Sequence, residues 1–151
     1  MEGLPSATSE SRPAYKLHLN PGDMTPEEQA RQFRASFEVE NHPSKRPFQL
    51  SLIEEEFNEF VEAQARIDEG GEGAADCLKE LADLVYVAYQ FAANEGWPLD
   101  QALLRVHVSN MSKLGPDGRP VRRTDGKVLK GYHYKPPFLN DLVDNTALAA
   151  N

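Results

Sequence analysis

Two long stretches with helical periodicity, joined by a very short glycine-rich segment, constrain this fold more than any other feature. Residues 74–94 contain KELADLVYVAYQFAA, in which only Asp83 and Gln90 are clearly polar between Leu81 and Ala93. The DEGGEG segment before it is short enough to force the two helices to be antiparallel neighbours. The sequence therefore predicts a helical hairpin that buries both apolar stripes. In residues 48–68, apolar side chains recur at helical spacing at Leu50, Ile53, Phe57, Phe60 and Val61.

The other helices are predicted from capping and breaking signals. TPEEQARQFRASFEVE begins with Thr25, then Pro26 at the first helical position and Glu28 three residues after the cap, which is a capping box with a favourable proline. Two prolines in residues 41–47 end this helix. A fourth helix is predicted over about residues 99–113, and the turn signals beyond it predict an ordered loop or small hairpin. The expected fold class is all-α, a bundle of four to five helices around the central antiparallel hairpin.

Length and composition indicate one domain. With 151 residues, we expect a flexible N-terminal arm over residues 1–22, a single domain over residues 23–140 and a C-terminal tail over residues 141–151. No apolar run approaches the length of a membrane span, and no secretory leader pattern is present. The single Cys77 cannot form an intrachain disulfide, so a reducing cytoplasm is the expected location.

The net charge of −8 is unevenly distributed. Between Lys113 and Lys135 there are seven basic and two acidic residues, so this segment carries about +5 and the rest of the chain about −13. A very acidic body does not bind a phosphate backbone on its own, so neither nucleic acid nor a membrane is an expected partner. An acidic body with metal ions, together with a basic tail, is suited to holding a small polyphosphate.

Each helix of the predicted hairpin carries carboxylates three residues apart. Glu56 and Glu59 belong to EEEFNEF, and Glu80 and Asp83 belong to ELAD. Residues three apart on a helix face the same way, and Glu55, four residues before Glu59, borders the same face. Because both apolar stripes must be buried, the two pairs are expected to meet across the hairpin. Facing carboxylates repel one another, and hard divalent cations relieve that repulsion.

The ligand type limits the metal. All the candidates are oxygen donors and neither motif contains a histidine, which favours Mg²⁺ or Mn²⁺ over zinc. A di-iron bundle needs Glu-x-x-His pairs, and these are missing. Such a site would hydrolyse a phosphoanhydride by clamping phosphates and lowering the pKa of an attacking water. The competing interpretation is that these acids form a solvated helix face, and we assign Glu54 and Glu62 to solvent.

The joined motifs resemble the all-α nucleoside triphosphate pyrophosphatases, that is, the MazG-like proteins with their dimeric dUTPase-like and phosphoribosyl-ATP pyrophosphohydrolase relatives. The resemblance rests on EEFNE followed by ELAD, continues through VHVSNMSKL and RRTDGKVLKGYHYKPPFL, and covers roughly residues 48–139. It implies hydrolysis of a (deoxy)nucleoside triphosphate between the α and β phosphates, with Mg²⁺ or Mn²⁺, in a homodimer or homotetramer. The implied role is house-cleaning of dUTP, dCTP or a non-canonical nucleotide.

By position, the resemblance implies that the four paired carboxylates Glu56, Glu59, Glu80 and Asp83 are metal ligands. Glu55 is implied as a further ligand or as the base that activates water. The implied substrate contacts are Asn110 and Lys113 to sugar or phosphate, and Lys127 and Lys130 to the triphosphate, with a solubilising surface as the alternative for Lys130. Tyr86, three residues after Asp83, shares its face and is a candidate sugar contact or a core tyrosine.

The first helix and NHPSKRPFQ match the family least clearly, and in the family this region frames the base pocket. Phe37, His42 and Gln49 are candidate lining residues. Two other functions stay open. One is phosphoribosyl-ATP hydrolysis. Only the basic tail argues against it, because that tail resembles the nucleoside triphosphate branch of the family. The other is a non-catalytic helical dimer that binds nucleotides or a protein partner.

Overall fold

The computed structural model describes residues 21–68 and 73–144, and this part of the chain is all-α, as predicted. Its described residues include two isolated β-bridges and no strand. None of the described helices is long and apolar enough to cross a membrane. Most of the expected N-terminal arm and C-terminal tail, residues 1–20 and 145–151, lies outside the described residues. The α-helices are α1 (Pro26–Ser36), α2 (Arg46–Asp68), α3 (Ala74–Glu95), α4 (Leu99–Met111) and α5 (Asn140–Asp144), with 3-10 turns η1 (Pro21–Asp23) and η2 (Pro43–Lys45).

The start of α1 is the predicted capping box. The backbone N–H of Glu28 donates to the Thr25 hydroxyl at 3.3 Å, and the backbone N–H of Thr25 donates to the Glu28 carboxylate at 2.8 Å. Two of the unpaired N–H groups at a helix start are thereby satisfied. The neighbouring Glu27 carboxylate accepts the backbone N–H of Asp100 at 3.1 Å, which ties α1 to the start of α4.

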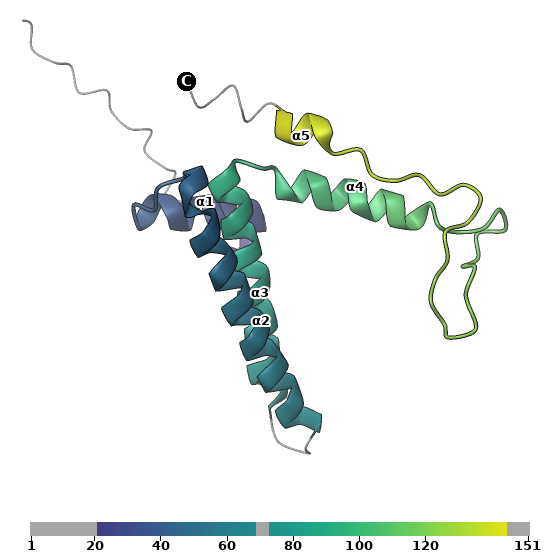
Figure 1. Cartoon of the computed structure of the whole chain (residues 1–151), viewed down its shortest axis with the longest axis horizontal. Helices are drawn as coiled ribbons and strands as arrows, with labels where there is room; N and C mark the ends of the chain where they lie inside the picture. Colours follow the sequence, from purple (N-terminus) through teal and green to yellow (C-terminus); the bar gives the residue numbers. More distant parts are fainter. Residues whose placement is uncertain (1–20, 69–72, 145–151) are drawn as a thin grey trace, which may run out of the picture.

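The predicted hairpin is formed by α2 and α3, which lie side by side over most of their length (Figure 1). α2 begins at Arg46, two residues earlier than expected, because η2 leads directly into it. α3 ends at Glu95 and is capped by Gly96, whose φ of 71° is left-handed. A glycine adopts this conformation without the steric penalty that a side chain brings. The chain then turns through Trp97 and Pro98 into α4.

A small core joins α1 to the last turns of α3. Ala30, Tyr89 and Ala93 are buried together, and Leu99 packs against them. The Tyr89 hydroxyl donates to Asp100 at 2.9 Å, so the core also anchors the first turn of α4. These contacts position α1 beside the start of α2 and the end of α3, away from the end of α2 and the start of α3 (Figure 1).

Next to this core lies a buried cation, Arg34, which is 4% exposed. Its Nε donates to the side-chain oxygen of Asn41 at 2.5 Å, and Nη2 donates to the Glu40 carbonyl at 2.9 Å and to Asn94 Oδ1 at 3.1 Å. Nη1 makes longer contacts, of 3.4–3.5 Å, to Gln90 and Gln49. Arg34 therefore holds α1, α2, α3 and the loop after α1 together through neutral acceptors.

One sequence expectation is wrong for the single chain: the apolar stripes of the hairpin are not fully buried. Phe57 is 52% exposed and Val85 49% exposed, and no large side chain in the described residues is fully buried. The two helices bury one edge of each stripe against each other and leave the rest open. Apolar area of this kind normally marks an interface. The exposed members are Leu50, Phe57 and Val61 on α2 and Leu78, Leu81 and Val85 on α3.

α4 runs away from the hairpin, and the chain beyond it turns and comes back along α4 to α5 (Figure 1). Arg105 on α4 forms an ion pair with Asp141 on α5, and the Ser109 hydroxyl donates to the Lys135 carbonyl at 2.8 Å. The first residues of the expected C-terminal tail are therefore helical and anchored to α4. The predicted hairpin-like segment is present as two bridges, Leu114 with Pro120 and Arg122 with Val128.

Candidate metal and phosphate site

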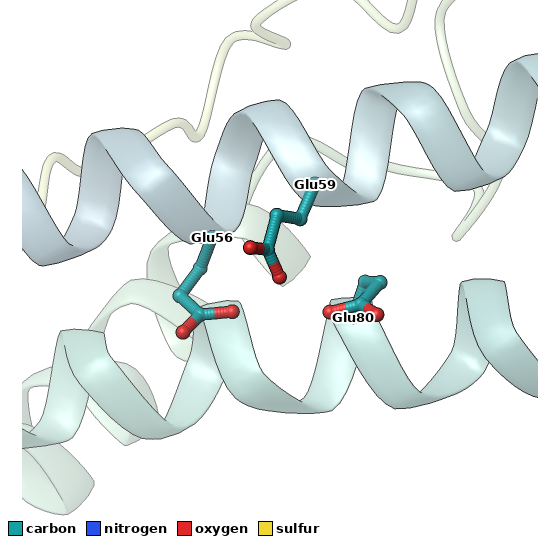
Figure 2. A group of neighbouring side chains, drawn as sticks. All are labelled: Glu56, Glu59 and Glu80. Atoms are coloured by element: carbon teal, nitrogen blue, oxygen red, sulfur yellow. The ribbon is translucent and has the colours of Figure 1, made fainter.

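Three carboxylates meet across the α2–α3 hairpin. Glu56 and Glu59 extend from α2 and Glu80 from α3, and the side chains point into the space between the helices (Figure 2). One oxygen of each lies within 4.8 Å of one oxygen of each of the others. The helical spacing that predicted this meeting is present, and α2 and α3 pack against each other; most of the glycine-rich segment, residues 69–72, lies outside the described residues. Three converging carboxylate oxygens at such separations are donors that Mg²⁺ and Mn²⁺ prefer.

The carboxylate of Glu56 is the member of the cluster with a buried oxygen that lacks a partner. Its Oε2 atom is buried and has no hydrogen-bond partner in the described part of the chain. Desolvation, followed by the negative charges of Asp83 and Glu59, raises the pKa of Glu56. A buried, unpaired carboxylate oxygen costs about 1–3 kcal/mol or more. A divalent cation would supply both the missing partner and the missing charge, so the residues present fit the metal that the sequence analysis expected.

Asp83, the fourth predicted ligand, lies beside the cluster but outside the converging group of three. Its carboxylate forms an ion pair of 3.0 Å with Lys79, which also contacts Glu80 at 3.1 Å. The two carboxylates raise the pKa of Lys79, mainly through these hydrogen bonds. Sequence reasoning missed Lys79, although its position four residues before Asp83 on the same helix was the signal that could have found it.

Glu55 and Tyr86, two further candidates, are not among the three converging carboxylates. Glu55 is exposed and outside the converging carboxylates. Tyr86 is partly buried, with its ring edge-on to Phe33 of α1 at 5.8 Å between centroids. Its hydroxyl is hydrogen-bonded to Gln90, and desolvation raises its pKa. The Tyr86 hydroxyl therefore has a hydrogen-bond partner within the fold, as expected of a core tyrosine. Tyr86 also lies one helical turn beyond Asp83, as expected of a sugar contact.

The basic candidates are not near the carboxylates. Asn110 and Lys113 lie at the far end of α4, where the Lys113 ammonium donates to Asn110 Oδ1 at 2.7 Å. Lys127 and Lys130 follow in the exposed turns beyond α4, and the Lys130 ammonium lies 4.6 Å from the centre of the Tyr134 ring. Figure 1 shows these turns at the end of α4 opposite to the hairpin. Within one chain, therefore, the structure does not bring the two predicted halves of the site together.

A cleft of about 710 Å³ opens between the end of α1, η2 and the start of α2. Gln49, one of the three candidates for the base pocket, lines it and is buried. The other two do not line it: Phe37 is 67% exposed, and His42 caps η2 by accepting the Ser44 backbone N–H at 3.1 Å. The lining residues are Arg34, Ala35, Glu38, Val39, Glu40, Lys45, Phe48 and Gln49.

Comparison with protein families agrees with this architecture. The family described as phosphoribosyl-ATP pyrophosphohydrolase matches residues 25–110, more than half of the chain, from the cap of α1 to the end of α4. The match includes both carboxylate motifs. Enzymes of this family hydrolyse a nucleotide phosphoanhydride and are typically dependent on a divalent metal. No curated protein matches the chain. The chain therefore belongs to the phosphoribosyl-ATP pyrophosphohydrolase family and is a nucleotide pyrophosphohydrolase, a hydrolase acting on acid anhydrides.

Proposed function

We propose that the chain hydrolyses a (deoxy)nucleoside triphosphate at the α–β phosphoanhydride, releasing the monophosphate and pyrophosphate. The observation that carries this proposal is the convergence of Glu56, Glu59 and Glu80 across the hairpin, with a buried Glu56 oxygen that lacks a partner. In the reaction, a water oxygen bonds to one phosphorus while the bridging oxygen leaves with the other phosphate. The water also loses a proton.

The carboxylates have two kinds of role in this proposal, holding the cation and accepting a proton. Glu56, Glu59 and Glu80 would hold the cation, and Asp83, paired with Lys79 beside them, is the fourth carboxylate that would be within its reach. A bound Mg²⁺ or Mn²⁺ neutralises phosphate charge and lowers the pKa of a bound water. Glu55, exposed at the border of the cluster, accepts the proton that the water loses. Tyr86, one turn beyond Asp83, is suited to contact the sugar.

Lys79 limits how strongly the cluster binds a cation, because its ammonium competes for Glu80 and Asp83. We expect Lys79→Ala to raise the affinity for Mn²⁺ on the order of tenfold, since a nearby positive charge is removed. Calorimetric titration of the chain with Mn²⁺ measures this change. Lys45→Ala, an exposed lysine of η2, is the control. An unchanged affinity in Lys79→Ala would mean that these ion pairs do not compete with the metal.

For the substrate we propose a nucleotide-pool triphosphate, such as dUTP, dCTP or a non-canonical deoxynucleotide. The base would enter the cleft beside Gln49, which lies seven residues before Glu56 on α2. Seven residues are two helical turns, about 10 Å along the axis, which suits a base at one end and phosphates at the other. Phosphoribosyl-ATP is the second candidate, and the description of the matching family favours it.

A homodimer or homotetramer is part of the proposal. The exposed stripes on α2 and α3 recur at helical spacing, so the hairpin of a second copy can cover them as in a four-helix bundle. A helical dimer that binds nucleotides without hydrolysing them would bury the same stripes of α2 and α3. Only a turnover measurement distinguishes such a dimer from an enzyme.

The decisive measurement is product analysis on a panel of triphosphates and phosphoribosyl-ATP with Mg²⁺ or Mn²⁺. We expect pyrophosphate and the monophosphate in equal amounts, and no product after chelation of the metal. The fastest substrate identifies the base. Glu59→Ala should be inactive, and Glu62→Ala, on the same helix, serves as the control. Orthophosphate as the first product would refute α–β cleavage, and absence of all turnover would favour the binding-only dimer.

A further inference from the structure

Three buried side-chain amides contact the guanidinium of Arg34, which fixes how each of them is oriented. Gln90 Oε1 accepts from Nη1 at 3.4 Å, Gln49 Oε1 accepts from Nη1 at 3.5 Å and Asn94 Oδ1 accepts from Nη2 at 3.1 Å. A guanidinium offers hydrogen-bond donors and no acceptor. The oxygen of each amide must therefore face Arg34, and the nitrogen of each amide must point away from it.

Two of these amides also have a partner for their nitrogen, and the third does not. Gln90 Nε2 donates to the Ala30 carbonyl at 3.5 Å, and Asn94 Nδ2 donates to the His42 carbonyl at 3.0 Å. In the described part of the chain Gln49 Nε2 has no acceptor, although Gln49 is only 3% exposed. A buried donor without a partner is unfavourable and needs an explanation.

The unpaired nitrogen faces the cleft at the start of α2. Among the described residues, Glu56 Oε2 is the fully buried side-chain polar atom that lacks a partner, so Gln49 Nε2 must reach accessible space. Gln49 lines the cleft of about 710 Å³, which supplies that space. Small-molecule sites occupy about 300–1,000 Å³. The cleft therefore has the size of a ligand site, and one of its walls carries a donor of fixed orientation.

The other side chains of the cleft suit a flat ring. Phe48, which is 59% exposed, lines the cleft next to Gln49. An aromatic face stacks on the face of every nucleobase and so discriminates little among bases. Glu38, Glu40 and Lys45 also line the cleft but are exposed, so water competes for their polar groups. Selection among bases therefore depends on the buried amide of Gln49.

The position of Gln49 relative to the carboxylates decides which edge of a base it meets. Gln49 lies seven residues before Glu56, on the same face of α2 and about 10 Å away along the axis. When the phosphates lie at the carboxylates, the base points toward Gln49. In a pyrimidine nucleotide the sugar is attached to N1, and C4 is the ring atom directly opposite, so the C4 substituent meets Gln49. In a purine nucleotide the corresponding substituent is on C6.

We propose that Gln49 selects bases that carry a carbonyl at this edge, that is, uracil or thymine over cytosine and hypoxanthine or guanine over adenine. Gln49 Nε2 donates to the exocyclic carbonyl oxygen, whereas an exocyclic amino group brings a second donor against it and leaves both unpaired. Gln49 Oε1 cannot accept from that amino group, because Arg34 holds it on the other side. The inference rests on the proposed function for the position of the phosphates, and it narrows the substrate class to triphosphates of keto bases.

The test compares ligands that differ at this one substituent. The probes are dUMP and dCMP, titrated calorimetrically into the full chain with Mn²⁺, and dIMP and dAMP form a purine pair. We expect dUMP to bind about tenfold more tightly than dCMP, because the amino group of dCMP leaves the buried donor unpaired. The purine pair should show the same order, with dIMP bound more tightly than dAMP.

Substitutions of Gln49 should change this preference in opposite ways. Gln49→Glu replaces the donor by an acceptor of nearly the same shape, and Arg34 stays paired through the other carboxylate oxygen. We expect this variant to prefer dCMP to dUMP by about tenfold, because the amino group now meets an oxygen. Gln49→Met, which neither donates nor accepts, should bind both probes equally. Gln101→Glu, which makes the same charge change at an exposed position of α4, is the control and should keep the wild-type preference. Thermal unfolding checks that each variant is folded.

Equal affinity of the wild-type chain for dUMP and dCMP would overturn the proposal and would mean that water satisfies Gln49 Nε2. An unchanged preference in either Gln49 variant, or no binding of any probe, would also overturn it. These binding measurements do not depend on turnover. A chain that prefers dUMP but hydrolyses no triphosphate would refute the enzymatic function alone. Release of pyrophosphate at equal rates from dUTP and dCTP, with equal binding of the two monophosphates, would keep the enzymatic function and refute selection by Gln49.

Discussion

Glu56→Gln is expected to reduce metal-dependent turnover by at least about 100-fold while making the metal-free protein more stable at neutral pH. Outer partners of metal ligands already change affinity or activity about 10–100-fold when removed, and the proposed function makes Glu56 a ligand of the cation itself. The buried Oε2 atom without a partner and the neighbouring acids oppose ionisation of Glu56. Glutamine has nearly the same shape and carries no charge, so Glu56→Gln removes the free-energy cost of ionising this buried group.

The expected pH dependence follows from the direction of the pKa shift. Because the pKa of Glu56 is raised in the folded state, its protonation favours folding. The metal-free protein is therefore stabilised as the pH falls toward the ordinary range of glutamate, and this stabilisation is lost as the pH rises through the raised pKa. Glu56→Gln should remove this part of the pH dependence.

Thermal unfolding in the presence of a chelator, at pH 7 and at about pH 5, measures both effects, and steady-state pyrophosphate release measures turnover. Glu54→Gln is a matched control, because Glu54 is an exposed acid of the same run. Wild-type activity in Glu56→Gln would contradict the metal assignment. A lower stability at pH 7 would contradict the account of Glu56 as an uncompensated buried acid.

Arg34→Met is expected to lower the free energy of unfolding by about 3 kcal/mol, since several buried acceptors lose their donor together. These acceptors are oxygens of Asn41, Glu40, Asn94, Gln90 and Gln49. Methionine fills much of the same space but donates no hydrogen bond. Desolvation lowers the pKa of Arg34, which means that burying its charge is unfavourable. The hydrogen bonds to its partners offset that unfavourable burial.

Urea unfolding at one fixed protomer concentration measures this change, because assembly of copies would otherwise shift the midpoint. Arg31→Met is the matched control: Arg31 lies one turn earlier on α1 and pairs with Glu27, and the Arg31 side chain itself is half exposed. Ion pairs at the surface contribute about 0–1 kcal/mol. Equal effects of the two substitutions would show that the Arg34 contacts contribute no more than a surface ion pair. The loss of unfolding free energy in Arg34→Lys should lie between those of Arg34→Met and Arg31→Met, because lysine keeps the charge without the planar set of donors.

The contrast between Glu56 and Glu54 shows how far sequence reasoning reaches into this site. Both belong to one acidic run, and helical spacing separates the glutamate that faces α3 from the one that faces solvent. Spacing does not reveal that one Glu56 oxygen is buried without a partner, because that depends on the packing of α2 against α3. Lys79 is a different case, because its spacing of four residues from Asp83 on one helix was visible in the sequence.

The sequence by itself determined the all-α class, the cap of α1, the antiparallel hairpin and the meeting of carboxylates across it. These features depend on residues close together in the chain and on a turn too short for other connections. Only the tertiary structure decided that Arg34 is buried, that the stripes of α2 and α3 remain half open, and that α4 points away from the carboxylates. Each of these depends on how distant segments pack and on the angle at one short junction, and local periodicity carries no information about either.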